Sequence, residues 1–439
     1  MTTLLKRAKG SALDIITERN ISLETIALLS PYARQIRSLN FLYNYWADIS
    51  TFHQILSGPL PLLRTLKICI GGFTNREDQH NLPPLPSSPL FGSAIDLEEF
   101  VLDSRCGGSL DHFVFPNLTT VKLFALELNA SYLFNFLRAS PMLRTVGLTI
   151  NRGTIPGSIP PDIVVILPNV ETFSLSVNGD VRSAYELAVH ISCPRAKDTL
   201  LTHQIHEYDL KLDLDVFPKS ASWVAIARQY TSPVEEVTLE MDCYQSGVLI
   251  ACSLTFQSSD ATFIKLGFQV DCADEEVGGP YRLCEMMNRQ IFFQACRAIQ
   301  GHPLLSHVKR LHFKVQTKYW GVDYLIPMSD AVQELFRSLG PLDELTIHVF
   351  DLRIFLAPFI DLPEFWHFER VFPSVKVLAI SETRMFEERQ GVNGMVELVK
   401  SHHEQGKPFE RVTVRAREIP TTTAERLRQW VNAVDCSEP

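Results

Sequence analysis

One short phrase recurs along the chain and limits what it can fold into. The phrase is an apolar residue, two others, an apolar residue, one other and a third apolar residue. In the twelve good copies the central residue is Leu39, Leu66, Phe100, Val121, Val146, Phe173, Val237, Ile264, Leu311, Leu345, Leu378 and Val412. A weaker copy has Leu210 and Leu212 but Glu207 in the first place. The central positions run from 39 to 412, which is one copy about every 31 residues.

Each copy predicts one short, half-buried strand. The second and third apolar residues are two positions apart and so point to the same side of a strand, while the first turns inward just before the strand begins. One such strand cannot bury its apolar side alone, so consecutive copies have to stack side by side. Parallel pairing needs a crossover of a dozen or more residues, and the spacing provides it.

Prolines and amphipathic segments fill the gaps between copies. A proline one or two residues ahead of a copy predicts the return from a helix to a strand. These prolines are Pro61, Pro116, Pro141, Pro168, Pro233, Pro341, Pro373 and Pro408. Apolar stripes predict helices over 222–230, over 329–339 and from Asn129. The capping box Thr422-x-x-Glu425 predicts a last helix that includes Leu427, Trp430, Val431 and Val434.

These patterns predict an α/β solenoid over residues 1–439, with parallel strands on its concave side and helices on its convex side. Residues 1–34 would form an N-terminal cap, and residues 422–439 a C-terminal cap helix and tail. The alternative is a set of separate α/β domains. The repeat lapses over 179–204 and 271–301, so the path of the chain there is open.

Composition and charge narrow the class of protein. The net charge is −9, with 41 basic and 50 acidic residues, which argues against nonspecific binding to nucleic acid. The nine cysteines contain no C-x-x-C pair, which favours free thiols in a reducing compartment. We find no signal-peptide core and no apolar run of about 20 residues. The expected location is cytoplasmic or nuclear, without a membrane partner.

The phrase resembles the strand half of the leucine-rich repeat, L-x-x-L-x-L-x-x-N. The asparagine place holds Asn44, Asn151 and Asn178, and Asp242 in a further copy, whereas most copies hold another residue. The chain therefore resembles an irregular member of that class with long repeats. In such repeats the asparagine side chains cap backbone groups along the turn after the strand.

A closer resemblance is to the irregular leucine-rich region of F-box-like proteins of mushroom-forming fungi. Their opening "G-S-x-L-D-I" is matched at 10–15, and "L-L-x-P-x-x-x-x-I-R-S-L" at 28–39, with similar phrases at 60–66 and 115–119. This resemblance implies the substrate-binding region of a cullin ubiquitin ligase. No F-box, which normally precedes this opening, is found in residues 1–9, so we expect no residue of this sequence to dock to the ligase adaptor. An orphan leucine-rich-repeat scaffold or decoy and an uncharacterised enzyme are the alternatives.

Strand residues between the apolar anchors are expected to face the concave side, where leucine-rich repeats usually bind proteins. Their charges are mixed and no aromatic stacking row appears, so we expect a protein partner and no nucleic acid. The candidate partner-binding residues are Lys122, Phe124, Lys265, His312, Lys314 and His348.

No catalytic, cofactor or metal site is expected. His203 and His206 lack a third metal ligand and are interpreted as a polar loop. The acidic run over 271–276 lacks the ligand spacing of a calcium loop and is interpreted as a solvated turn. His402 and His403 are interpreted as an exposed last turn of a helix. The enzyme alternative depends only on these clusters.

Overall fold

A computed structural model describes the fold. The residues it describes are 10–16, 28–43, 60–70, 94–104, 114–125, 130–150, 164–178, 187, 190–206, 233–244, 249–258, 263–271, 303–316, 339, 341–349, 372, 374–382, 389–415 and 421–437. Within them the chain is α/β, with sixteen strands in long, mostly parallel β-sheet and few helices. Two compact units, Met1–Leu200 and Leu201–Pro439, are treated in turn. That the whole chain is one solenoid remains a prediction.

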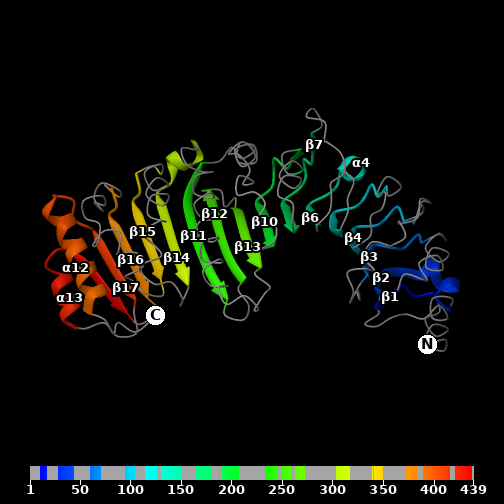
Figure 1. Ribbon diagram of the computed structural model, residues 1–439. Coiled ribbons are helices and arrows are strands. Elements are labelled where there is room, and N and C mark those ends of the chain that lie inside the picture. The colour runs from blue at the N-terminus through cyan, green and yellow to red at the C-terminus, as the bar shows by residue number, and fades with distance from the viewer. Residues whose placement is uncertain are drawn as a thin grey trace. The chain divides into compact units, whose positions relative to one another are not determined.

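The strands of the first unit follow one another in the sheet in the order of the sequence (Figure 1). They are β1 (Leu13–Ile16), β2 (Ile36–Tyr43), β3 (Thr65–Ile70), β4 (Glu99–Ser104), β5 (Thr120–Ala125), β6 (Thr145–Ile150) and β8 (Thr172–Asn178). All neighbouring pairs among them are parallel. A separate parallel pair is formed by β7 (Val165–Ile166) and β9 (Ile191–Ser192).

The predicted phrase sets the register of this unit. Its central residues are paired directly from strand to strand and are all buried: Leu39, Leu66, Phe100, Val121, Val146 and Phe173. A slip of one residue would move every one of these side chains to the opposite face. The six strands predicted here are therefore confirmed in position and direction.

The region predicted as an N-terminal cap contains a strand and a short helix. Strand β1 pairs with β2, and Ile15 lies opposite Leu39. A 3-10 helix, η1 (Ser30–Gln35), leads directly into β2. The Arg37 guanidinium bonds the Asp14 carboxylate across the two strands and holds the pKa of that carboxyl below its usual value. This ion pair links β1 to β2 through their side chains, in addition to the main-chain pairing.

The lead-in prolines occupy tight turns. The amide of Leu63 donates to the carbonyl of Leu60 at 3.1 Å, so Pro61 is the second residue of a four-residue turn. In the same way, the amide of Leu118 donates to the carbonyl of Phe115 at 3.1 Å, so Pro116 is the second residue of that turn. Proline suits this position because its φ is already fixed near the value that the turn requires. At Pro61 and Pro116 the structure thus shows a turn directly before the strand, and nearly all the residues ahead of these turns, where a helix was predicted to end, lie outside the described residues.

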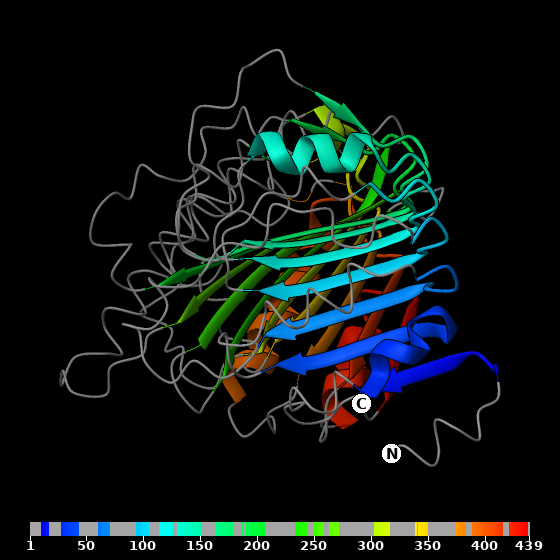
Figure 2. The same cartoon turned by 90° about the vertical axis from the view of Figure 1, so that its right-hand side faces the viewer.

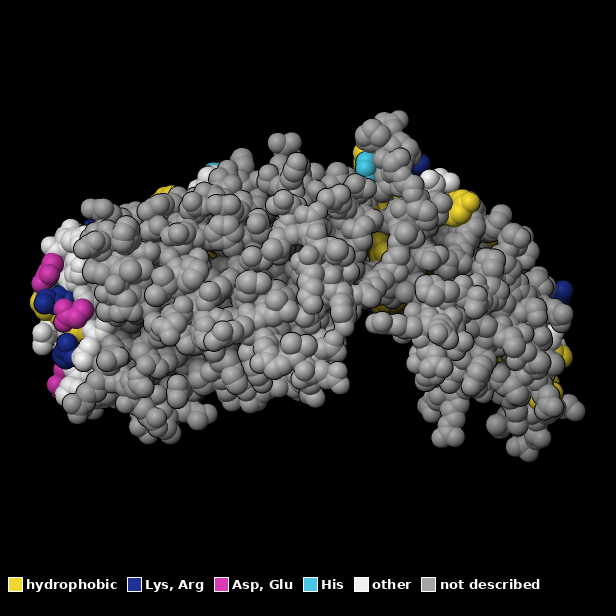
Figure 3. Space-filling model, viewed as in Figure 1, with side chains coloured by type: hydrophobic (Ala, Val, Ile, Leu, Met, Phe, Trp, Pro, Cys, Tyr) yellow, Lys and Arg dark blue, Asp and Glu magenta, His cyan; other side chains and the backbone are white. Residues whose placement is uncertain are grey.

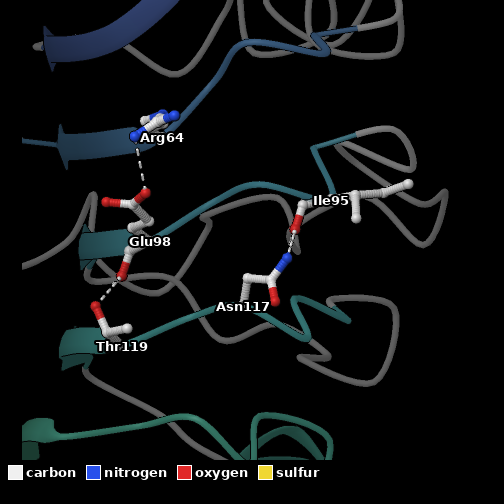
Figure 4. A network of polar contacts seen from close by, with 5 residues as sticks. All are labelled: Arg64, Ile95, Glu98, Asn117 and Thr119. Atoms are coloured by element: carbon white, nitrogen blue, oxygen red, sulfur yellow. Dashed lines mark hydrogen bonds and ion pairs between the residues drawn. The ribbon is translucent and has the colours of Figure 1, made fainter.

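Successive turns of the first unit are joined by a polar ladder (Figure 4). The carbonyl of Glu98 accepts the amides of Thr119 and Thr120 at 2.9 and 3.0 Å, and the Thr119 hydroxyl at 3.0 Å. The Asn117 side-chain amide donates to the carbonyl of Ile95 at 3.1 Å. Since each turn satisfies carbonyls of the turn before it, the ladder fixes the spacing between repeats.

Replacing Asn117 with alanine is expected to destabilise the first unit by about 0.5 to 1.5 kcal/mol, because one net hydrogen bond is lost. Asn169 makes the equivalent bond to the carbonyl of Pro141 at 3.1 Å, so Asn169→Ala should cost a similar amount. Urea unfolding of the two variants against wild type measures both losses. Two unchanged midpoints would show that the asparagine bonds of the ladder add nothing to stability.

A helix covers part of the core of the first unit. α4 (Ala130–Arg138) confirms the helix predicted from Asn129, and Leu133, Phe136 and Leu137 are buried as expected. It lies along the strands of its unit in Figure 2. The rings of Phe100 and Phe136 are 6.3 Å apart, which ties the helix to β4.

The second unit combines a parallel series with an antiparallel segment. Its strands are β10 (Asp198–His206, which begins in the first unit), β11 (Val234–Tyr244), β12 (Leu249–Ser258), β13 (Phe263–Asp271), β14 (Arg310–Gln316), β15 (Glu344–Val349), β16 (Val377–Glu382), β17 (Arg411–Arg415) and β18 (Ala433–Ser437). A 3-10 helix, η5 (Pro303–His307), precedes β14. From β11 through β14 to β18 the pairing is parallel, with these residues in direct register: Val237, Leu311, Leu345, Leu378, Val412 and Val434.

The prediction of parallel strands throughout is wrong at β12. The sheet order here is β10-β13-β12-β11-β14, and β12 pairs antiparallel with both β11 and β13. The connections from 244 to 249 and from 258 to 263 are too short for a parallel crossover, so the chain forms hairpins instead. The copy centred on Ile264 is a strand, as predicted, but β12 separates it from the copy centred on Val237.

The predicted C-terminal cap helix is also shorter than expected. α13 (Thr421–Leu427) ends before Trp430, and Val434 lies in β18 opposite Val412. A strand prevails over a helix here because β18 supplies hydrogen-bond partners to the open side of β17. The prediction that Trp430, Val431 and Val434 are helical is therefore wrong.

His402 is not on an exposed turn. It lies in the last turn of α12 (Arg389–Glu404), is 1% exposed, and stacks on Phe409 with ring centroids 4.4 Å apart. The outer surface of α12 and α13 is charged instead: Figure 3 shows acidic and basic side chains interleaved there, and Glu397 pairs with Lys400 at 3.6 Å and with Arg426 at 3.8 Å.

Several predictions lie outside the described residues. They are the weak copy at 210, the helix over 222–230 and nearly all of the helix over 329–339. Asn44 and Asn151 of the expected asparagine ladder also lie outside them.

Candidate partner-binding face

Alternate side chains of the parallel series in the second unit turn away from the buried core. Along each strand the buried residues alternate with half-buried ones, as the two-residue period of a strand requires. Parallel register aligns these outward residues into rows across the strands. The middle row is Thr238, His312, Thr346, Ala379 and Thr413. The row toward the carboxyl ends of the strands is Glu240, Lys314, His348, Ser381 and Arg415.

Four of the six predicted partner-binding residues lie on this outward face of the second unit. His312 and Lys314 are on β14, His348 is on β15, and Lys265 is on β13. Antiparallel pairing through β12 places Lys265 opposite Thr255, and Thr255 opposite Thr238, so Lys265 continues the middle row.

The other two predicted residues belong to the first unit. Lys122 and Phe124 lie on β5, and both side chains are exposed on the face opposite its buried residues. Their neighbours in register are Val101 and Gly147 beside Lys122, and Asp103 and Thr149 beside Phe124. A Cβ at Gly147 would meet the Lys122 side chain at 3.4 Å, so the glycine leaves room for the lysine stem.

At the amino ends of β11 and β14 the charges neutralise one another. One carboxylate, that of Glu236, lies 3.1 Å from Nε of Arg310 and 3.3 Å from Nε2 of His312. Sequence reasoning omitted Glu236 and Arg310. Each lies two residues before a position of the middle row and therefore points to the same side of its strand. Extending the two-residue period toward the start of the strands would have found both.

Glu240 forms the second charged contact of the face. Its Oε2 lies 3.8 Å from Nζ of Lys265 and accepts the Ser253 hydroxyl at 3.4 Å. Lys265 and Ser253 are on β13 and β12, so this contact spans the antiparallel segment. It draws the carboxylate toward β13.

Lys314 and His348 are direct cross-strand neighbours. Burial and the nearby Lys314 ammonium lower the pKa of His348, and the more distant Glu240 carboxylate opposes that shift. Both causes favour the neutral imidazole, which can donate or accept a hydrogen bond at neutral pH. Among the residues that the structure describes, no carboxylate forms an ion pair with Lys314 or Arg415.

No metal-binding cluster of three or more His, Cys, Asp or Glu occurs in the described part of the chain. His203 and His206 lie on β10 rather than on the loop that we predicted, and Asp271 ends β13. The two cysteines with described environments, Cys193 and Cys436, are free, and burial raises the pKa of Cys193 to about 12. Within the described helices, none has the length and hydrophobicity needed to cross a membrane.

A comparison with protein-family models, with curated proteins and with solved structures found no match to this chain.

Proposed function

We propose that this chain is a non-catalytic protein-recognition array of the leucine-rich type, which binds a polypeptide on the outward face of β11 and β14–β17. The observation that carries the proposal is the alignment of alternate polar side chains into rows across these strands. Such rows present many weak contacts at a regular spacing, which suits an extended or convex protein surface. The resemblance to F-box-like leucine-rich regions points the same way.

A substitution in the middle of the face tests this function. Ala379 lies in the middle row between Thr346 and Thr413, where an arginine would block the face without entering the core. Partners captured with the full chain would be identified, purified and rebound to Ala379→Arg. We expect at least a tenfold loss of affinity, about 1.4 kcal/mol. Gln405→Arg, at an exposed position just after α12, should leave binding unchanged.

Purified partners that bind wild type and Ala379→Arg equally well would overturn this placement of the binding face. The same capture also separates two versions of the function. Cullin or adaptor peptides recovered with the chain would support a role as the substrate-binding part of a ubiquitin ligase. Partners recovered repeatedly without them would favour an orphan scaffold or decoy.

A further inference from the structure

The row at the carboxyl ends of the strands differs in charge balance from the row at their amino ends. At the amino ends, Glu236 neutralises Arg310 and faces His312. At the carboxyl ends, the Glu240 carboxylate pairs with Lys265. On the next strands of the sheet the same row continues from Lys314 to Arg415.

Four successive strands define the geometry of that row, which we call the cationic row: Lys314, His348, Ser381 and Arg415. Neighbouring strands are about 4.8 Å apart, so the three steps from Lys314 to Arg415 span about 14 Å. An extended peptide rises about 3.3 Å per residue, so four residues cover about 13 Å. Two side chains at positions i and i+4 of such a peptide would therefore reach both cations.

The residues between the cations fit the middle of such a peptide. His348 is half-buried and Ser381 carries a hydroxyl, so both can hydrogen-bond a backbone that crosses above them. Arg415 is exposed and offers a planar group that can bind both oxygens of one carboxylate. Lys314 supplies a point charge at the other end.

We propose that the cationic row binds an extended acidic segment of a protein partner, with carboxylates four residues apart held by Lys314 and Arg415. This inference rests on the proposed function and deepens it by naming the chemistry of the partner. A polynucleotide is a poorer occupant, because Glu344 and Asp435 lie on the same face, in register with Arg310 and Thr413, and would repel a continuous phosphate backbone.

Short labelled peptides test the proposal with the full-length chain. One twelve-residue peptide carries glutamates at i and i+4 in a Ser/Thr/Gly background, a second carries them at i and i+1, and a third replaces both with glutamine. Fluorescence anisotropy should show the first binding at least tenfold more tightly than the third and more tightly than the second. Lys314→Glu and Arg415→Glu should each weaken the first peptide at least tenfold.

Lys376→Glu is the matched control. Lys376 is an exposed lysine of the same unit that pairs with Glu410 in the turns before β16 and β17, away from the cationic row. It should leave the affinity unchanged. A peptide with lysine at i and i+4 should bind the double variant Lys314→Glu, Arg415→Glu better than it binds wild type. Circular dichroism of each variant checks that it is folded.

The outcomes distinguish failure of the acidic-segment proposal from failure of the proposed recognition function. Equal binding of the first and third peptides, equal effects of Lys314→Glu and Lys376→Glu, or preference for a single-stranded oligonucleotide would overturn the acidic-segment proposal. If Ala379→Arg still abolished binding of a captured protein, the recognition function would stand without it. If neither the peptides nor any captured protein depended on this face, both would fail.

Discussion

Replacing Phe100 with alanine is expected to destabilise the first unit by about 3 to 5 kcal/mol. Phe100 is 1% exposed, and its ring lies 5.7 Å from that of Phe115 and 6.3 Å from that of Phe136. The three rings come from β4, from the turn before β5 and from α4, so the substitution opens a cavity where successive repeats meet. Urea unfolding followed by circular dichroism measures the loss, and hydrogen exchange of peptides from 94–150 locates it.

Phe124→Ala is the matched control, because it makes the same chemical change on the opposite face of the next strand. Phe124 is 37% exposed, so its truncation leaves no closed cavity and should cost less than about 1 kcal/mol. Equal losses for the two variants would contradict the assignment of the core to the face of Phe100. A loss below about 1 kcal/mol for Phe100→Ala would do the same.

The repeated phrase was sufficient to predict most strands, and their register within each parallel series, because each strand buries only one face. Where one face is buried, the two apolar residues that flank each outward position fix which side points inward. Leu345, for example, is fully buried and lies between Leu311 and Leu378, as the phrase requires. Direction followed from the long gaps between these copies, which leave room for the crossovers that parallel pairing requires.

Strand β10 was missed because smaller or more polar residues occupy the phrase. Before and within β10, the three places hold Ala196, Thr199 and Leu201, which are all buried. Pro194 marks the turn before it, closed by the bond from the Ala196 amide to the Cys193 carbonyl at 3.0 Å. Pro194 was thus a better indicator of β10 than the hydrophobic pattern, because that pattern favoured the weaker copy centred on Leu210.

At β18 the signal was ambiguous rather than weak. Val431, Val434 and Cys436 fit the strand phrase, but Leu427, Val431 and Val434 also fit a helical stripe. Only the open edge of β17 decides between the two, and an edge is a property of the assembled sheet. The strand β12 was missed because no proline directly precedes it in the sequence and only short connections join it to its neighbours.

The candidate face could be predicted in part. Alternation alone indicated that Lys265, His312, Lys314 and His348 point away from the core of their strands. The partners of these charges depend on which strands are neighbours, and Glu236 meets Arg310 only because β11 lies beside β14. The order of the copies along the sequence instead predicted that the strand centred on Ile264 would lie beside β11. The contrast between a neutralised row and a cationic row was therefore inaccessible from the sequence.

Replacing His402 with alanine is expected to destabilise the second unit by about 2 to 4 kcal/mol, because a buried ring is removed from beneath α12. The ring stacks on Phe409, which is itself fully buried just before β17. The cavity would loosen the contact between the helix and the last strands. Urea unfolding gives the size of the effect, and hydrogen exchange over 389–415 should show faster exchange in α12.

His403→Ala separates the buried ring from its neighbour on the same turn. His403 is half-buried, its Nδ1 lies 3.0 Å from the Trp430 carbonyl oxygen, and the centroids of the His403 and Trp430 rings are 5.4 Å apart in an edge-on arrangement. Its loss should cost about 1 kcal/mol, the value of one net hydrogen bond. If both histidines were on an exposed last turn, neither substitution would change stability by more than about 0.5 kcal/mol. A larger loss for His402→Ala than for His403→Ala is therefore the result that a buried His402 requires, whereas losses below about 0.5 kcal/mol for both would support the exposed turn that the sequence alone favours.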